Sequence, residues 1–314
     1  MNNDMITKIN ERKKRWTNFL NNTGDVPYMF LVNCPENVPL RPSPYPENKK
    51  ERIEWSWNLY NIQLDRMSWL DDDMVPHLKV YTGTEIFAEA FGCKVHRPPR
   101  SNPCALPMIT DLADVPKLKT PDIDVPCLKM LFDIADELKA KGGPDALLKM
   151  VDIQSPMDIA ALLMDKTIYY AALLEEPEVI RELAGKVRAL LMAFLDKWFA
   201  RYGRECMAHH PDYFMPGGIT LSEDEIGVIS SDVFKDLFLP ELVELSKKYG
   251  AIGIHCCAKS RHQWDLIKTI PNLKLLNLNQ PKPILAEAYS FFAPYAAHMH
   301  SWCGDGDPET WFSN

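Results

Sequence analysis

The stretch at residues 250–278 constrains the fold most, because it has the pattern of a strand, a helix and a second strand. A run of small and β-branched residues at 251–254 predicts a buried strand. Ser260 is suited to cap a helix that Pro271 ends, and a second apolar run follows at 273–278. Two strands joined by a helix are the unit of a parallel sheet, whose functional side chains lie beyond the carboxyl ends of the strands.

The same alternation runs through the rest of the chain. Further strands are predicted at 26–34, 75–81, 147–153, 205–209 and 296–300, and irregular segments at 93–126 and 212–229. There is no internal repeat or linker, so we expect an α/β fold, a single (β/α)8 TIM-like barrel domain over residues 1–314 with an N-terminal helical extension at 1–24. Seven strands are predicted in place of eight. Either one strand has no clear pattern, or the barrel lacks or truncates its eighth strand.

Composition excludes several classes of partner. The net charge of −8 argues against nucleic acid and against an anionic membrane surface, both of which favour a basic face. Residues 1–15 are polar and do not resemble a signal peptide, and no stretch approaches the roughly 20 apolar residues that cross a bilayer. The eight cysteines are therefore expected to be thiols of a cytoplasmic protein.

A histidine and a thiol two positions apart end the strand at 251–254. Residues i and i+2 of a strand project to the same side, so His255 and Cys257 can face one point. Cys303 follows the last predicted strand and can reach the same end of the barrel. Two thiolates and one imidazole form a zinc-like donor set with an open fourth position, although a buried His or Cys is more often packed than liganding.

Other polar residues also follow predicted strands. The acidic run that includes Glu223 and Asp224 is either a solvated surface or a source of a further metal ligand or an acid/base group. Asn33, Gln154 and His210 lie at or after strand ends, where they are candidates to bind substrate. No glycine-rich phosphate-binding loop or serine-hydrolase motif is present, so nucleotide and serine-hydrolase chemistry have no support.

Four segments, in order, resemble the uroporphyrinogen decarboxylase superfamily. They are the strand exit and helix start at 152–160, the helix at 229–240, the His-x-Cys segment at 254–258 and the turn at 304–308. The resemblance covers most of residues 25–312, and it implies a (β/α)8 barrel and a homodimer.

The His-x-Cys segment is most similar to the branch of methylcobamide:thiol methyltransferases. This likeness implies that zinc bound by His255, Cys257 and Cys303 activates a small thiol substrate. It also implies that the thiolate takes a methyl group from a corrinoid. The Asp-x-His-x-x-Gly corrinoid-binding motif is absent from this chain, so the corrinoid is expected on a partner protein.

Two alternatives remain open. The first is a metal-independent decarboxylase acting on a porphyrinogen or a smaller carboxylate, which requires basic residues at the barrel mouth. Against it, the arginine-rich loop of the true decarboxylases is replaced here by the segment at 33–37, with only Arg41 nearby. The second is a non-catalytic binding protein of the same fold, which predicts no cavity at the mouth.

Overall fold

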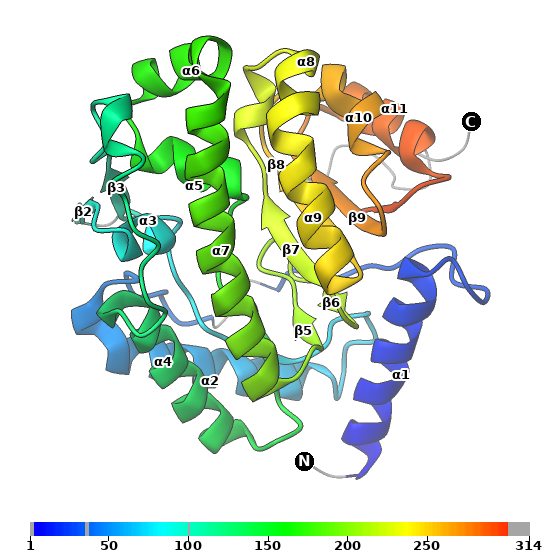
Figure 1. Ribbon diagram of the computed structural model, residues 1–314. Coiled ribbons are helices and arrows are strands. Elements are labelled where there is room, and N and C mark those ends of the chain that lie inside the picture. Colours follow the sequence, from blue (N-terminus) through cyan, green and yellow to red (C-terminus); the bar gives the residue numbers. More distant parts are fainter. Residues whose placement is uncertain (1–2, 35–37, 100, 301–314) are drawn as a thin grey trace.

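A computed structural model of the chain describes residues 3–34, 38–99 and 101–300. Strands and helices alternate through most of the chain (Figure 1). The helices are α1 (Asn3–Leu20), α2 (Lys49–Arg66), α3 (Ile86–Ala90), α4 (Pro126–Gly142), α5 (Pro156–Leu163), α6 (Lys166–Glu175), α7 (Pro177–Tyr202), α8 (Ser231–Val233), α9 (Leu239–Tyr249), α10 (Trp264–Ile267) and α11 (Lys282–Phe292). The strands are β1 (His77–Lys79), β2 (Lys94–His96), β3 (Cys104–Leu106), β4 (Leu147–Lys149), β5 (Cys206–Met207), β6 (Phe214–Met215), β7 (Ile219–Ser222), β8 (Ile252–Cys256), β9 (Leu273–Leu278) and β10 (Ala297–His298).

Two four-stranded sheets form the inner layer of the molecule. Their strand orders are β1-β4-β5-β6 and β10-β9-β8-β7, and every pair is parallel except β5 with β6. A parallel bridge between Gln154 and Ser222 joins the segment after β4 to the end of β7. Helices such as α7 and α9 lie across the outer side of the strands (Figure 1). The predicted α/β class with a TIM-like barrel is confirmed, although no ladder joins β10 to β1 within the described ranges.

The core lies between the strands and the outer helices, and α7 shows why its sequence forms a helix. Leu183, Val187, Leu190, Phe194 and Trp198 recur at three or four residues, and each is at most 1% exposed. This spacing places them on one face of the helix. Burying a side chain of this size contributes about 1.5–3 kcal/mol, so the stripe holds α7 on the barrel.

One predicted strand, at 26–34, is wrong. The segment pairs with no strand among the described residues. The Phe30 N–H donates to Asp73 Oδ2 at 2.9 Å, and the Asp73 N–H donates to the Phe30 carbonyl at 3.0 Å. The Val32 N–H donates to Asp72 Oδ2 at 3.1 Å. Carboxylates therefore satisfy backbone groups that a neighbouring strand would otherwise bond.

The irregular segments predicted at 93–126 and 212–229 also need correction. The first contains the antiparallel pair β2–β3, and the second contains β6 and β7. Gly218 allows β7 to begin beside β8, because a Cβ there would lie 2.4 Å from the carbonyl oxygen of Ala251.

The number of strands in the parallel ladders is still seven, because the predicted strand at 26–34 is lost and β7 is gained. The seven are β1, β4, β5, β7, β8, β9 and β10. The existence of an eighth strand stays open.

Helix α1 accounts for most of the predicted N-terminal extension at 1–24. It is held by Trp16, whose Nε1 donates to the Asp73 carbonyl at 2.8 Å, and by Arg12, whose Nη1 donates to the Met74 carbonyl at 2.7 Å. The single-domain organisation over 1–314 stays a prediction, because residues 301–314 lie outside the described ranges.

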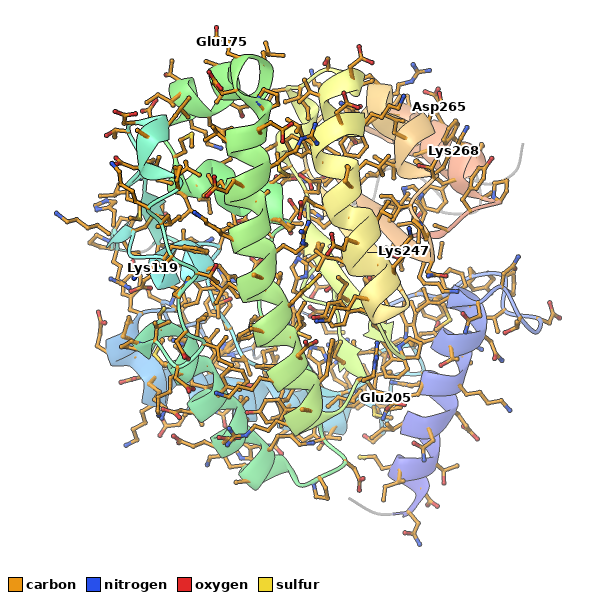
Figure 2. All side chains as sticks on the ribbon, viewed as in Figure 1. Lys119, Glu175, Glu205, Lys247, Asp265 and Lys268 are labelled. Carbon is orange, nitrogen blue, oxygen red and sulfur yellow. The ribbon has the colours of Figure 1, made fainter. Side chains whose placement is uncertain are left out.

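Charged side chains cover the outside of the molecule. Figure 2 shows Lys119, Glu175, Lys247 and Asp265 at the periphery, and all four are exposed. Within the described part of the chain, none of the helices has both the length and the apolar character needed to cross a membrane.

Candidate functional site

A cavity of about 340 Å³ opens where the parallel strands end. Lys79 and Lys149, the last residues of β1 and β4, lie in its wall, and His255 of β8 lines it too. Lining residues that follow strand ends include Tyr81, Asp152, Gln154, His209, His210 and Asp224. The volume is that of a site for a small molecule, and its position is where chemistry was expected in a parallel barrel.

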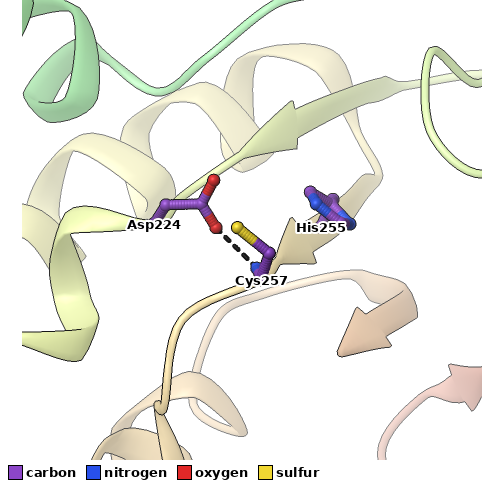
Figure 3. A group of neighbouring side chains, drawn as sticks. All are labelled: Asp224, His255 and Cys257. Atoms are coloured by element: carbon purple, nitrogen blue, oxygen red, sulfur yellow. Dashed lines mark hydrogen bonds between the residues drawn. The ribbon is translucent and has the colours of Figure 1, made fainter. Parts of the chain in front are cut away.

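Asp224, His255 and Cys257 bring three potential metal ligands together (Figure 3). Their donor atoms all lie within 4.8 Å of one another. His255 is paired in register with Ser222 at the end of β7, and Asp224 follows Ser222 by two residues. The β7–β8 ladder therefore sets the carboxylate beside the imidazole. As predicted from strand geometry, His255 and Cys257 point to the same place.

A hydrogen bond to Asn277 fixes the orientation of the His255 ring. Its Nδ1 lies 2.6 Å from Oδ1 of Asn277, and Nδ2 of Asn277 donates to the Met299 carbonyl at 2.5 Å. A carbonyl oxygen only accepts hydrogen bonds, so the Asn277 amide must turn its oxygen toward His255. The proton of the neutral ring therefore sits on Nδ1, and Nε2 keeps a lone pair. Metal-binding histidines are commonly oriented in this way.

A hydrogen bond from its backbone N–H holds Cys257 beside Asp224. Its N–H donates to Asp224 Oδ1 at 2.6 Å, drawn as the dashed line in Figure 3. Burial and the Asp224 carboxylate raise the pKa of the Cys257 thiol to about 11. The free protein therefore keeps this thiol protonated at neutral pH. A cation between the two side chains would favour the thiolate, because it reverses the local charge.

The comparisons with known proteins identify the family. Residues 77–296, more than half of the chain, match the family described as Uroporphyrinogen decarboxylase (URO-D). The chain belongs to the uroporphyrinogen decarboxylase family. No curated protein matches this URO-D sequence.

A solved structure shares the fold of this URO-D family member. A methyltransferase from Methanosarcina mazei superposes with a TM-score of 0.68 and covers 94% of this chain and 84% of its own chain. The two sequences are 12% identical, so the likeness concerns the fold.

Three residues predicted to bind substrate take different positions in this URO-D protein. Gln154 and His210 line the cavity, and the ring of His210 lies 4.3 Å from that of His255, centroid to centroid. Burial and the nearby His255 lower the pKa of His210 to about 4, which keeps it neutral at pH 7. Asn33 is exposed and does not line the cavity. Cys303, predicted as the third metal ligand, lies outside the described residues.

The two predicted acid/base residues lie on opposite sides of the chain after β7. Asp224 lines the cavity, whereas Glu223 is fully buried and does not. Burial, then the nearby Asp158 carboxyl, raises the pKa of Glu223 well above its usual value. Burial and the second carboxyl thus both favour the protonated form of Glu223. Its role as an acid/base group stays a prediction.

Sequence reasoning missed a charged cluster in the cavity wall. Lys79 and Lys149 are paired in register on β1 and β4, and both bond Asp212, with Lys79 Nζ 2.6 Å from Oδ2. His77 Nε2 lies 3.6 Å from the same oxygen. Although burial alone would raise it, Lys149 and Lys79 hold the pKa of Asp212 well below its usual value. A lysine inside each of two largely apolar runs, at 75–81 and 147–153, was the available signal.

Proposed function

We propose that this URO-D family member is a zinc-dependent methyltransferase that moves a methyl group from a corrinoid, carried by a partner protein, to a small thiol. The observation that carries the proposal is the convergence of Asp224, His255 and Cys257 at the mouth of the barrel. The fold shared with a methyltransferase supports the same reading.

The donor atoms fit zinc in kind and nearly in distance. One imidazole nitrogen, one sulfur and one carboxylate oxygen are all zinc ligands. Ligand atoms around a tetrahedral zinc stand about 3.5 Å apart, given bonds of about 2.0–2.3 Å, so the 4.8 Å limit found here leaves about 1 Å to close. Three protein ligands leave the fourth position for substrate, which is typical of catalytic sites. Asp224 thus supplies the third donor for which the sequence analysis expected Cys303.

Bound zinc would turn the substrate thiol into a thiolate near neutral pH. The residues of this chain would orient the ligands of the metal. Asn277 keeps the His255 lone pair aimed at the site, and Asp224 holds the Cys257 backbone beside it. A corrinoid on the partner protein would supply the methyl group, and Asp224, His255 and Cys257 would hold the zinc that keeps the accepting sulfur a thiolate, its proton passing to solvent.

The size of the cavity determines how the methyl donor must arrive. About 340 Å³ accommodates a small thiol, but a corrinoid is many times larger. The methyl group must therefore be presented at the open end by a corrinoid bound elsewhere, which agrees with a corrinoid-carrying partner.

The decisive experiment measures zinc in the purified protein. Elemental analysis after purification without chelators should give about one zinc per chain, and His255→Ala should lose it because one of three ligands is removed. His262→Ala is the matched control, since its Nε2 bonds the Ile229 carbonyl, away from the site. Metal-free, folded wild-type protein that cannot methylate a thiol from methylcobalamin would rule out the proposal.

One observation favours a metal-independent decarboxylase as the second candidate. Three cations, Arg41, Lys79 and Lys149, line the cavity. The two lysines share Asp212, whereas Arg41 stacks on Tyr81 with its guanidinium 4.4 Å from the ring centre. Among the described residues no carboxylate pairs with Arg41, and such a cation suits a carboxylate substrate. Release of carbon dioxide by metal-free protein would favour this candidate. The cavity itself argues against the non-catalytic alternative.

A further inference from the structure

Asp158 lies on α5, outside the cavity, and bonds the backbone from which Asp224 projects. Its Oδ2 accepts the N–H of Asp224 at 2.8 Å, and its Oδ1 accepts the N–H of Glu225 at 3.0 Å. Strand β7 has ended at Ser222, so these two amides have no place in its ladder. Asp158 is 2% exposed, and water therefore has little access to replace it.

The position of Asp158 is itself fixed by the end of β7. Ser155 caps α5 by accepting the N–H of Asp158 at 3.0 Å. The Ser155 N–H donates to the Ser222 carbonyl at 2.8 Å, and the Ser222 N–H donates to the Ile153 carbonyl at 2.9 Å. The segment that starts α5 is therefore paired with β7 two residues before Asp224. The Asp158 side chain and the backbone of Ser155 therefore both bond the segment at 222–225.

We propose that Asp158 is a positioning residue for the metal centre, setting the Asp224 carboxylate against His255 and Cys257. Its two hydrogen bonds fix the peptides on both sides of the Asp224 Cα atom. The Asp224 carboxylate in turn accepts the Cys257 N–H at 2.6 Å, so the placement of Asp224 carries over to Cys257. The inference rests on the proposed metal site, but its structural part can be tested without metal.

The first test measures cobalt(II), a spectroscopic substitute for zinc, in Asp158→Asn. The amide keeps one acceptor and turns an N–H₂ donor toward a backbone N–H, so one of the two bonds is lost. We expect cobalt affinity to fall about 10- to 100-fold, as is typical when a partner of a ligand is removed, with a changed d–d spectrum. Titration against a competing chelator measures the affinity.

Asp165→Asn is the matched control for this test. Asp165 also accepts two backbone N–H groups, from Thr167 and Ile168, at the start of the next helix. It does not bond the Asp224 turn. A general effect of losing a carboxylate that accepts two backbone N–H groups would appear in both variants, whereas a positioning role predicts a change in cobalt affinity and spectrum for Asp158→Asn alone.

The second test uses amide hydrogen exchange of the metal-free protein. The amides of Asp224, Glu225 and Cys257 should be protected in the wild type and should lose protection in Asp158→Asn. Fast exchange of the Asp224 and Glu225 amides in the wild type overturns the inference even if the variant does not fold. Retention of both cobalt affinity and Cys257 protection in Asp158→Asn also overturns it. A wild type that binds no metal but shows the expected protection refutes the proposed function and leaves the positioning role standing.

Discussion

At the scale of single residues, Asn277 decides which nitrogen of His255 faces the cavity. The amide is 5% exposed and bonded on both sides, so it cannot turn over without losing two hydrogen bonds. A histidine that presented Nδ1–H to the site would offer a donor where a metal needs a lone pair.

Replacing Asn277 tests this orientation. Asn277→Leu removes the acceptor for His255 Nδ1–H, and we expect cobalt(II) affinity to fall about 10- to 100-fold. Asn277→Asp keeps an acceptor for that proton and should retain more of the affinity than the leucine variant. Competition titration measures both. Wild-type affinity in Asn277→Leu would show that the hydrogen bond does not position the ring.

The sequence predicted the relative positions of site residues only where they lie on the same strand. The relation between His255 and Cys257 follows from the two-residue repeat of a strand. The roles of Asn277 and Asp158 depend on which strands are neighbours and in what register, and a single sequence does not contain that. Asp224 was one candidate for a metal ligand or an acid/base group, but its position beside His255 and Cys257 depends on the β7–β8 ladder.

At the scale of elements, the segment 26–34 shows how side chains can replace a strand. Its apolar pattern is typical of a strand, but it forms no ladder among the described residues. Two carboxylates that precede β1, Asp72 and Asp73, bond it instead of a ladder. Strand β7, in contrast, was predicted to be irregular. It has only four residues, between glycines and an acidic run, and is too short to show a repeat. Long helices such as α7 were predictable because the apolar stripe repeats over many turns.

Removing one carboxylate should release this segment. Asp73→Ala leaves the Phe30 N–H without its charged acceptor and breaks the 2.9 Å pair with Arg15, so we expect a loss of about 1–3 kcal/mol in unfolding free energy. Urea unfolding measures the loss, and limited proteolysis should cut within 26–34. Asp71→Ala is the control, because that carboxylate is fully exposed and 3.9 Å from Arg12, and it should change stability by less than about 0.5 kcal/mol. Equal losses in the two variants would contradict this account.

At the scale of the whole molecule, Asp212 ties three parts of the barrel together. It follows β5 and bonds lysines on β1 and β4, which are paired in register and would repel each other without it. Its pKa is lower in the folded protein than in the unfolded chain. The stability that it contributes is therefore fully present above the unfolded value of about 4 and is lost as pH falls through the folded value.

Asp212→Asn should alter the acid side of the stability profile. At neutral pH we expect a loss of about 1–3 kcal/mol, less than for a fully buried pair because the carboxylate is 31% exposed. Below about pH 4 the slope of unfolding free energy against pH should become shallower, because one titrating group is gone. Urea unfolding across pH measures both effects. Asp265→Asn, at an 81% exposed carboxylate, is the control, and an unchanged acid slope in Asp212→Asn would contradict the assignment.

The order in which the ribosome delivers the chain has a consequence for how the protein is loaded. Asp224, His255 and Asn277 belong to neighbouring strands or strand exits of the sheet β10-β9-β8-β7, and the brace on the imidazole is the last of the three to be synthesised. A nascent chain halted before β9 would carry the donors without their orienting partner. Under the proposed function, the metal would therefore enter late in biogenesis, once most of the polypeptide has emerged.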